Sequence, residues 1–166
     1  MTSADTPRWR LLAWALALLA ALLIAGCGDK EPERDAAGRI EGAGQVRLLQ
    51  LRVGDCISNL RDSFNDPDGS HNGVPRVKAV PCAEPHDGEL LRIDAIGEGD
   101  WPGSSIVNGE AARGRQALQP RLTAANASAG KLTLLSFTPT QDRWEFEDQH
   151  EIVYLALYTK SRTGTL

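Results

Sequence analysis

The sequence lacks the short motifs by which several large enzyme classes are recognised. It has no HExxH zinc motif, no GxSxG nucleophile elbow and no phosphate-binding loop. Only three cysteines are present, and no two of them form the CxxC pair typical of a zinc site. These absences argue against zinc proteases, hydrolases with a serine nucleophile and nucleotide-binding enzymes.

Basic side chains are fewer than acidic ones. The chain has 18 Lys and Arg against 22 Asp and Glu, a formal net charge of −4. Residues 1–26 contain Arg8, Arg10 and Asp5, so the chain beyond them carries 16 basic and 21 acidic side chains, a net of −5. Because a negative protein is repelled by phosphates, we expect neither nucleic acid nor anionic lipid headgroups as its main partner.

The first 26 residues have the pattern of a secretory signal. Arg8 and Arg10 precede an almost unbroken apolar run over 11–25, which small residues close. The run is shorter than the roughly 20 apolar residues of a membrane-spanning helix, and the polar residues 29–31 cannot extend it. An uncleaved transmembrane helix is the alternative. Either interpretation puts the rest of the chain outside the cytoplasm, because the cationic residues stay inside.

The end of this run is an aliphatic residue, two small residues and a cysteine, namely Ile24, Ala25, Gly26 and Cys27. It resembles the lipobox of bacterial lipoproteins. The resemblance implies that the signal is cleaved before Cys27 and that this cysteine carries a diacylglyceryl group with acyl chains such as palmitate. We therefore expect a protein anchored by lipid to the extracytoplasmic face of the cell membrane.

Three segments are expected along the chain: a signal peptide over 1–26, a lipidated cysteine with a flexible tether over 27–44, and a domain over 45–166. The tether is predicted from composition. Residues 28–44 are charged and rich in Gly and Ala, with Ile40 as an isolated aliphatic residue. Such a segment buries too little apolar surface to offset the entropy of ordering it.

The domain is expected to be α+β, with a small, mostly antiparallel sheet, one main helix and one disulfide. Hydrophobic patterning predicts strands over 46–53, 77–82, 89–96, 132–137 and 151–159, with a surface loop over 58–73. The last strand has a near-continuous apolar run over 152–157, which predicts a central strand covered on both faces.

The main helix is predicted over 104–119. Val107, Ala111, Gly114 and Leu118 recur at helical spacing and would form its buried stripe. Pro120 is expected to end or kink the helix, because proline lacks a backbone N–H and clashes with the preceding turn. Residues 123–130 are expected to form a loop.

Cysteine arithmetic predicts the disulfide. With Cys27 lipidated, Cys56 and Cys82 are the two remaining thiols. In an oxidising compartment such a pair is most simply one disulfide. Two unpaired buried cysteines, or part of a metal site, are the alternatives.

Five different short motifs follow one another along the domain. They are Gly54-Asp55-Cys56, Val80-Pro81-Cys82, Pro85-His86-Asp87 with Glu89, Trp101-Pro102-Gly103, and Pro139-Thr140 with Trp144. In order and spacing, the chain from about Val53 to Tyr158 resembles the septum-formation domain of actinobacterial membrane proteins and lipoproteins. The resemblance implies an association with septation and carries no particular chemistry.

One departure from that family concerns a second cysteine pair, which its members usually carry between the helix and the last strand. By spacing, these positions fall near Arg115 and at Val153 or Tyr154, and no cysteine stands there. The departure implies that this chain has lost one disulfide that the fold does not require.

The strongest candidate for a site is His86 with Glu84, Asp87 and Glu89 nearby. An imidazole among carboxylates can perform acid–base chemistry or bind a metal. The alternative is a structural turn between strands, in which these side chains hold the backbone by hydrogen bonds. A catalytic site also needs a nucleophile and an oxyanion or metal device. The sequence offers only a possible base, so we favour the turn and predict no catalytic residue, metal or cofactor.

The sequence therefore predicts a non-catalytic, lipid-anchored interaction module outside the cytoplasm. Its expected partner is an envelope protein or a cell-wall component, with a link to the cell envelope or septum formation. The alternative is a small-ligand or metal-binding lipoprotein with a site around His86.

Overall fold

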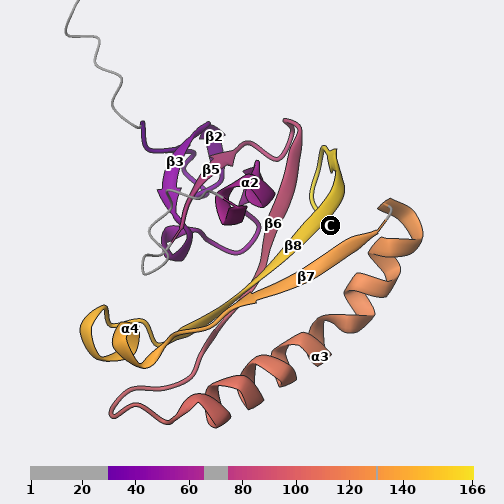
Figure 1. Ribbon diagram of the computed structural model, residues 1–166. Coiled ribbons are helices and arrows are strands. Elements are labelled where there is room, and N and C mark those ends of the chain that lie inside the picture. Colours follow the sequence, from indigo (N-terminus) through magenta and orange to yellow (C-terminus); the bar gives the residue numbers. More distant parts are fainter. Residues whose placement is uncertain (1–29, 66–74, 130) are drawn as a thin grey trace, which may run out of the picture.

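The computed structural model describes residues 30–65, 75–129 and 131–166 (Figure 1). The expected signal peptide and Cys27 lie outside these residues, as do residues 66–73 of the loop expected over 58–73. In the described part, a six-stranded antiparallel sheet with strand order β3-β5-β4-β6-β8-β7 stands beside a two-stranded hairpin, β1-β2. With the long helix α3 and the disulfide described below, this confirms the expected α+β fold.

The bounds of the elements follow the chain. The strands are β1 Glu33–Arg34, β2 Ile40–Gly42, β3 Gly44–Arg47, β4 Cys56–Ser58, β5 Arg76–Val80, β6 His86–Ala95, β7 Leu132–Phe137 and β8 Glu151–Arg162. The helices are η1 Leu48–Gln50, a 3-10 turn, and the α-helices α2 Leu60–Asn65, α3 Ser104–Ala129 and α4 Gln141–Phe146. No helix among the described residues is both long enough and apolar enough to cross a bilayer.

Strand β8 is shared by two hydrophobic cores. Val153 and Leu155 enter the core formed with β3, η1, β4 and β5. Ile152, Tyr154 and Ala156 enter the core beneath α3. The expectation of a central strand buried on both faces is confirmed, because β8 lies between β6 and β7 and its residues 152–156 are all buried. Figure 1 shows β6 and β8 running together from the N-terminal half toward α4.

Helix α3 is longer than predicted. Its predicted stripe is buried at all four positions, but the helix continues through Pro120 to Ala129. The expected end at residue 119 and the expected loop over 123–129 are therefore wrong. Leu122 and Ala125 extend the stripe at helical spacing and are 4% and 6% exposed, so their burial offsets the roughly 3 kcal/mol that a proline costs inside a helix.

The segment expected to be a tether is structured from Lys30 onward, and that prediction is wrong for residues 30–44. The Arg34 guanidinium donates to both carboxylate oxygens of Asp55, at 2.8 and 2.6 Å. Gln45 donates its N–H to the Lys30 carbonyl, and Ile40 enters the first core. Composition missed this hairpin because the contacts that attach it to the domain, such as the Arg34–Asp55 ion pair and the buried Ile40 side chain, are made with residues distant in sequence.

Two further local predictions need correction. The strand expected over 46–53 ends at Arg47, where a 3-10 turn follows that buries Leu48; Leu51, just after it, is buried as well. The loop expected from residue 58 contains the short helix α2. In both places apolar side chains reach the core from a tight turn, which periodicity over a few residues does not distinguish from a strand or a loop.

Helix α3 lies so close to β8 that one of its glycines is required. A Cβ at Gly114 would overlap with the hydroxyl group and ring of Tyr154. Of the two strand positions considered for the family's absent cysteine, Tyr154 is therefore the one that faces α3, whereas Val153 faces the other core.

Two alanine substitutions in α3 should have opposite signs. At Gly109 a Cβ meets no atom within 4 Å, so Gly109→Ala should stabilise the protein by about 1 kcal/mol through helix propensity. Gly114→Ala should instead destabilise it by about 1–3 kcal/mol, because Tyr154 must move to admit the methyl group. Urea unfolding of the two variants measures both free energies. A stabilised Gly114→Ala variant would contradict the packing described here.

Candidate functional site

The side chains predicted to form a site around His86 lie in different surroundings. His86 begins β6 and is 1% exposed. Its Nδ1 lies 2.8 Å from the Glu84 carbonyl oxygen, so Nδ1 carries the proton of that hydrogen bond. Its Nε2 has no hydrogen-bond partner among the described residues, and the ring packs edge-on against Tyr158 at 6.1 Å between centroids. The imidazole is therefore closed off from solvent.

The two acidic neighbours of His86 take unrelated positions. The Asp87 carboxylate accepts a hydrogen bond of 2.9 Å from the backbone N–H of Leu60 and so holds the first turn of α2. The side chain of Glu84 is exposed, and only its backbone serves His86. His86 and Asp87 both bind backbone groups, but they lie in strand β6 and not in the turn expected between the strands.

Glu89 is buried in the second core, where it binds the end of the described chain. One carboxylate oxygen accepts hydrogen bonds from the Tyr158 hydroxyl at 2.9 Å and from the Leu166 N–H at 2.8 Å. The other oxygen lies 3.5 Å from the Arg121 guanidinium. The sequence suggested a ligand group at Glu89, whereas the structure uses its carboxylate to join β6, β8, α3 and residue 166.

The two tyrosines of β8 should ionise at a higher pH than tyrosine in an unfolded chain. Burial, followed by the nearby Asp94 carboxylate, raises the pKa of Tyr154 to about 12, and burial with Glu89 raises the pKa of Tyr158 as well. An unfolded tyrosine ionises near pH 10, so the folded state loses stability as the pH rises from about 10 to about 12. These are the only two tyrosines of the chain, and absorbance at 295 nm follows both. Ionisation of both near pH 10 with the near-ultraviolet dichroism unchanged would contradict this expectation.

Cys56 and Cys82 form the predicted disulfide, with 5.2 Å between their Cα atoms. The bond joins β4 to the turn between β5 and β6. Among the described residues, no three His, Cys, Asp or Glu side chains are grouped as a metal site would require. The structural feature of the described part of this region is therefore a turn that the disulfide connects to β4.

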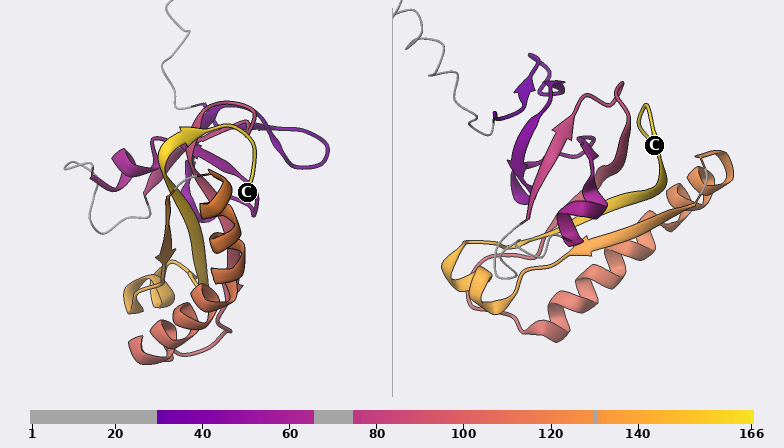
Figure 2. Two further views of the ribbon diagram at one scale, coloured as in Figure 1. Left: turned by 90° about the vertical axis from the view of Figure 1, so that its right-hand side faces the viewer. Right: turned by 45° about the horizontal axis from the view of Figure 1, so that its top comes forward.

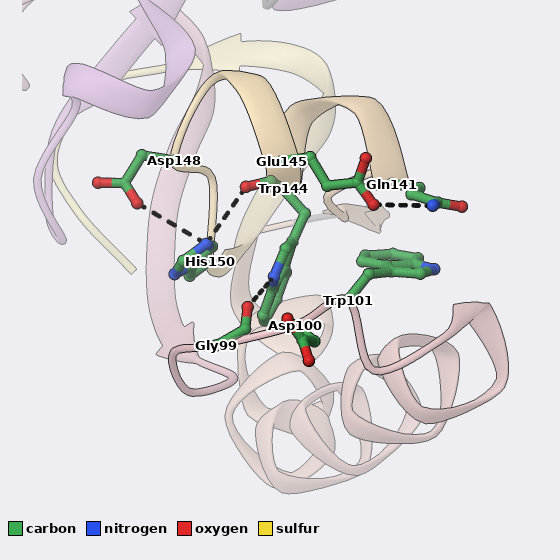
Figure 3. A pocket seen from close by; sticks show the side chains of 8 residues that line it. All are labelled: Gly99, Asp100, Trp101, Gln141, Trp144, Glu145, Asp148 and His150. Carbon is green, nitrogen blue, oxygen red and sulfur yellow. Dashed lines mark hydrogen bonds and ion pairs between the residues drawn. The ribbon is translucent and has the colours of Figure 1, made fainter.

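A second group of side chains forms a cleft at the far end of the sheet (Figure 3). It lies between the loop that joins β6 to α3 and the segment from α4 to the start of β8, and has a volume of about 570 Å³. We call it the aromatic cleft; its lining residues are Gly99, Asp100, Trp101, Gln141, Trp144, Glu145, Asp148 and His150.

Trp144 holds the aromatic cleft together. Its indole N–H donates to the Gly99 carbonyl at 2.7 Å, which ties α4 to the loop before α3. His150 stacks on it at 4.1 Å between ring centroids, and Trp101 meets it edge to face at 5.5 Å. Trp144 is 5% exposed, whereas Trp101 is only partly buried. Trp101 therefore offers the aromatic surface that a ligand can reach.

Three carboxylates line the aromatic cleft, and Figure 3 shows Asp148 on the far side of His150 and Trp144 from Trp101. Asp100 and Glu145 are exposed side chains on opposite walls, and Asp148 follows α4. Glu145 accepts a hydrogen bond of 2.8 Å from the Gln141 amide, and Asp148 lies 3.7 Å from His150 Nε2. Among the residues that the structure describes, no Lys or Arg lines the aromatic cleft. Its chemistry is thus aromatic and anionic.

Both tryptophan motifs are visible in the sequence, but the sequence did not predict that they are in contact. Trp101-Pro102-Gly103 and Trp144 are part of the motifs that carry the family resemblance, and neither was predicted to form a site. The two tryptophans are separated by more than forty residues in sequence. They meet because β6 and β8 are antiparallel, so the end of β6 lies beside the start of β8. One signal could have found them, since Trp101 and Trp144 are the only tryptophans beyond residues 1–26.

No family model, curated protein or solved structure matches this chain. The likeness to the septum-formation domain therefore rests on the quoted motifs alone.

Proposed function

We propose that this protein is a non-catalytic interaction module, anchored to the extracytoplasmic face of the cell membrane by lipid on Cys27, which binds an envelope protein through the aromatic cleft. The observation that carries the proposal is the cleft itself. The partly buried Trp101 lies there near Asp100 and Glu145, with Asp148 at the other end, in a space of about 570 Å³ that is open to solvent.

The role of His86 supports binding over catalysis. Acid–base chemistry requires a group within hydrogen-bond reach of a substrate. His86 is 1% exposed, and the carboxylates of Asp87 and Glu89 are already bound to backbone or hydroxyl groups. The alternative of a small-ligand or metal site around His86 thus has less support than binding at the aromatic cleft.

The position of the aromatic cleft suits a partner in the cell envelope. Figures 1 and 2 place α4 and the loop before α3 at the end of the molecule away from the β1-β2 hairpin, through which the chain leads back to Cys27. A domain anchored on the hairpin side would present the cleft away from the bilayer. A link to septum formation is part of this proposal through the quoted motifs.

Complementation of a deletion strain tests the proposal with three variants of the full chain. Cys27→Ser should lose lipid labelling and rescue, because the protein is no longer held at the membrane. Trp101→Ala should keep its amount and labelling but lose rescue, since Trp101 is partly exposed and its loss leaves the contacts of Trp144 with Gly99 and His150 in place. His86→Ala, if folded, should rescue. Rescue by Trp101→Ala, or failure of a folded His86→Ala, would refute the function proposed for the cleft.

A further inference from the structure

We infer that the aromatic cleft receives an arginine side chain of the partner protein. This inference rests on the proposed function and specifies its ligand. It begins with charge: Asp100, Glu145 and Asp148 line the cleft, and none of its described lining residues is a Lys or Arg. The arginine nearest in sequence, Arg143 of α4, lies with its guanidinium carbon 4.8 Å from the Phe137 ring centroid instead.

The carboxylates of the aromatic cleft keep acceptor capacity for a ligand. Glu145 has one neutral partner, the Gln141 amide, and Asp148 is 96% exposed with His150 as its only ion-pair partner among the described residues. A carboxylate has about four lone-pair positions, so both can accept further hydrogen bonds. A cationic donor would satisfy them and offset the local negative charge.

The tryptophan geometry makes an arginine the best match. Of the two rings, Trp144 is enclosed by His150, Trp101 and Gly99, which leaves Trp101 as the accessible indole. In Figure 3 the Gln141–Glu145 pair stands across from the Trp101 ring, so one group can contact the ring and the Glu145 carboxylate together. A planar guanidinium stacks on an indole while its N–H fork binds a carboxylate, which a lysine ammonium does less well.

A neutral sugar is the strongest competing ligand, because sugars also stack on tryptophan and bind carboxylates and amides. It would leave the negative charge of the cleft without compensation, whereas a guanidinium neutralises part of it. The charge of the lining residues therefore favours arginine over a sugar.

The test uses the full chain in uncharged detergent micelles with Trp9→Phe and Trp14→Phe. These changes leave Trp101 and Trp144 as the only tryptophans, so intrinsic fluorescence reports the aromatic cleft alone. The probe is a short blocked peptide, acetyl-Gly-Arg-Gly-amide, and its control is the same peptide with citrulline, which is nearly isosteric and uncharged. The arginine peptide should give a saturable change with at least tenfold higher affinity than the citrulline peptide, and added salt should weaken it.

Charge variants connect the binding to the cleft. Glu145→Gln and Asp148→Asn together should weaken the arginine peptide by tenfold or more and leave the citrulline peptide unchanged. Glu147→Gln is the matched control, because Glu147 is an exposed carboxylate at the end of α4 that does not line the cleft. Equal binding of both peptides, an unchanged affinity in the double variant, or charge-independent binding of an N-acetylglucosamine oligomer in place of the peptide would overturn the inference.

A parallel experiment separates this inference from the proposed function. A photo-crosslinking residue at Gln141, in the cleft, is compared in living cells with one at Gln119, an exposed position on α3. A discrete protein adduct at Gln141 alone, without arginine-peptide binding, overturns the arginine ligand and leaves the cleft as the binding site. The absence of both an adduct and peptide binding overturns the ligand and the proposed function together.

Discussion

Replacing Glu89 by Ala is expected to destabilise the protein by about 2–5 kcal/mol, because it removes a buried acceptor that serves two donors. The Tyr158 hydroxyl and the Leu166 N–H would lose their partner, and Tyr158 is only 2% exposed. Urea unfolding of a soluble form over 28–166, followed by fluorescence, measures the loss. Trp101 and Trp144 are the only tryptophans of that form.

Glu84→Ala is the matched control for Glu89→Ala. The Glu84 side chain is exposed, and its backbone carbonyl, which bonds to His86, is retained in alanine. The free energy of unfolding should therefore change by no more than about 0.5 kcal/mol. Both residues belong to the group that the sequence suggested as a site. Equal effects of the two substitutions would contradict the buried role of Glu89.

Removal of the disulfide is the second large effect. Cys56 and Cys82 are separated by 26 residues, and for a loop of this length chain entropy predicts about 3.5 kcal/mol of stabilisation. A double Cys56→Ser, Cys82→Ser variant should lose that amount in urea unfolding. This is a large share of the 5–15 kcal/mol typical of a whole domain.

Thiol titration checks the same bond without a stability measurement. The soluble form over 28–166 contains no cysteine other than Cys56 and Cys82, so it should show no free thiol when denatured without reductant. Reduction should release two. Two free thiols before reduction would contradict the bond.

Patterns carried by many residues predicted the fold well. The strand over 132–137 was predicted at its observed bounds, because its flanking turn residues delimit a short apolar run. The stripe of α3 was found from four apolar positions at helical spacing, and all four are buried. Because such patterns reflect which side chains are buried, they predict the elements of the folded chain well.

Features carried by single contacts escaped prediction. Nothing in the composition of residues 30–44 indicates that Arg34 binds Asp55, and nothing local indicates that helix α3 continues beyond Pro120. The aromatic cleft escaped for the same reason. Trp101 and Trp144 meet only through the pairing of β6 with β8, and a sequence without an alignment does not report that meeting.

The ordered hairpin at the start of the domain limits how far an anchored protein can reach. Lys30 already bonds to Gln45, so a lipid on Cys27 would be joined to the fold by a link of three residues. At no more than about 3.6 Å per residue, that link spans at most about 11 Å. The domain would then rest close to the headgroups with its orientation restricted and the aromatic cleft directed toward the cell wall. A membrane-embedded partner could reach the cleft only with an extracellular segment long enough to extend past the whole domain.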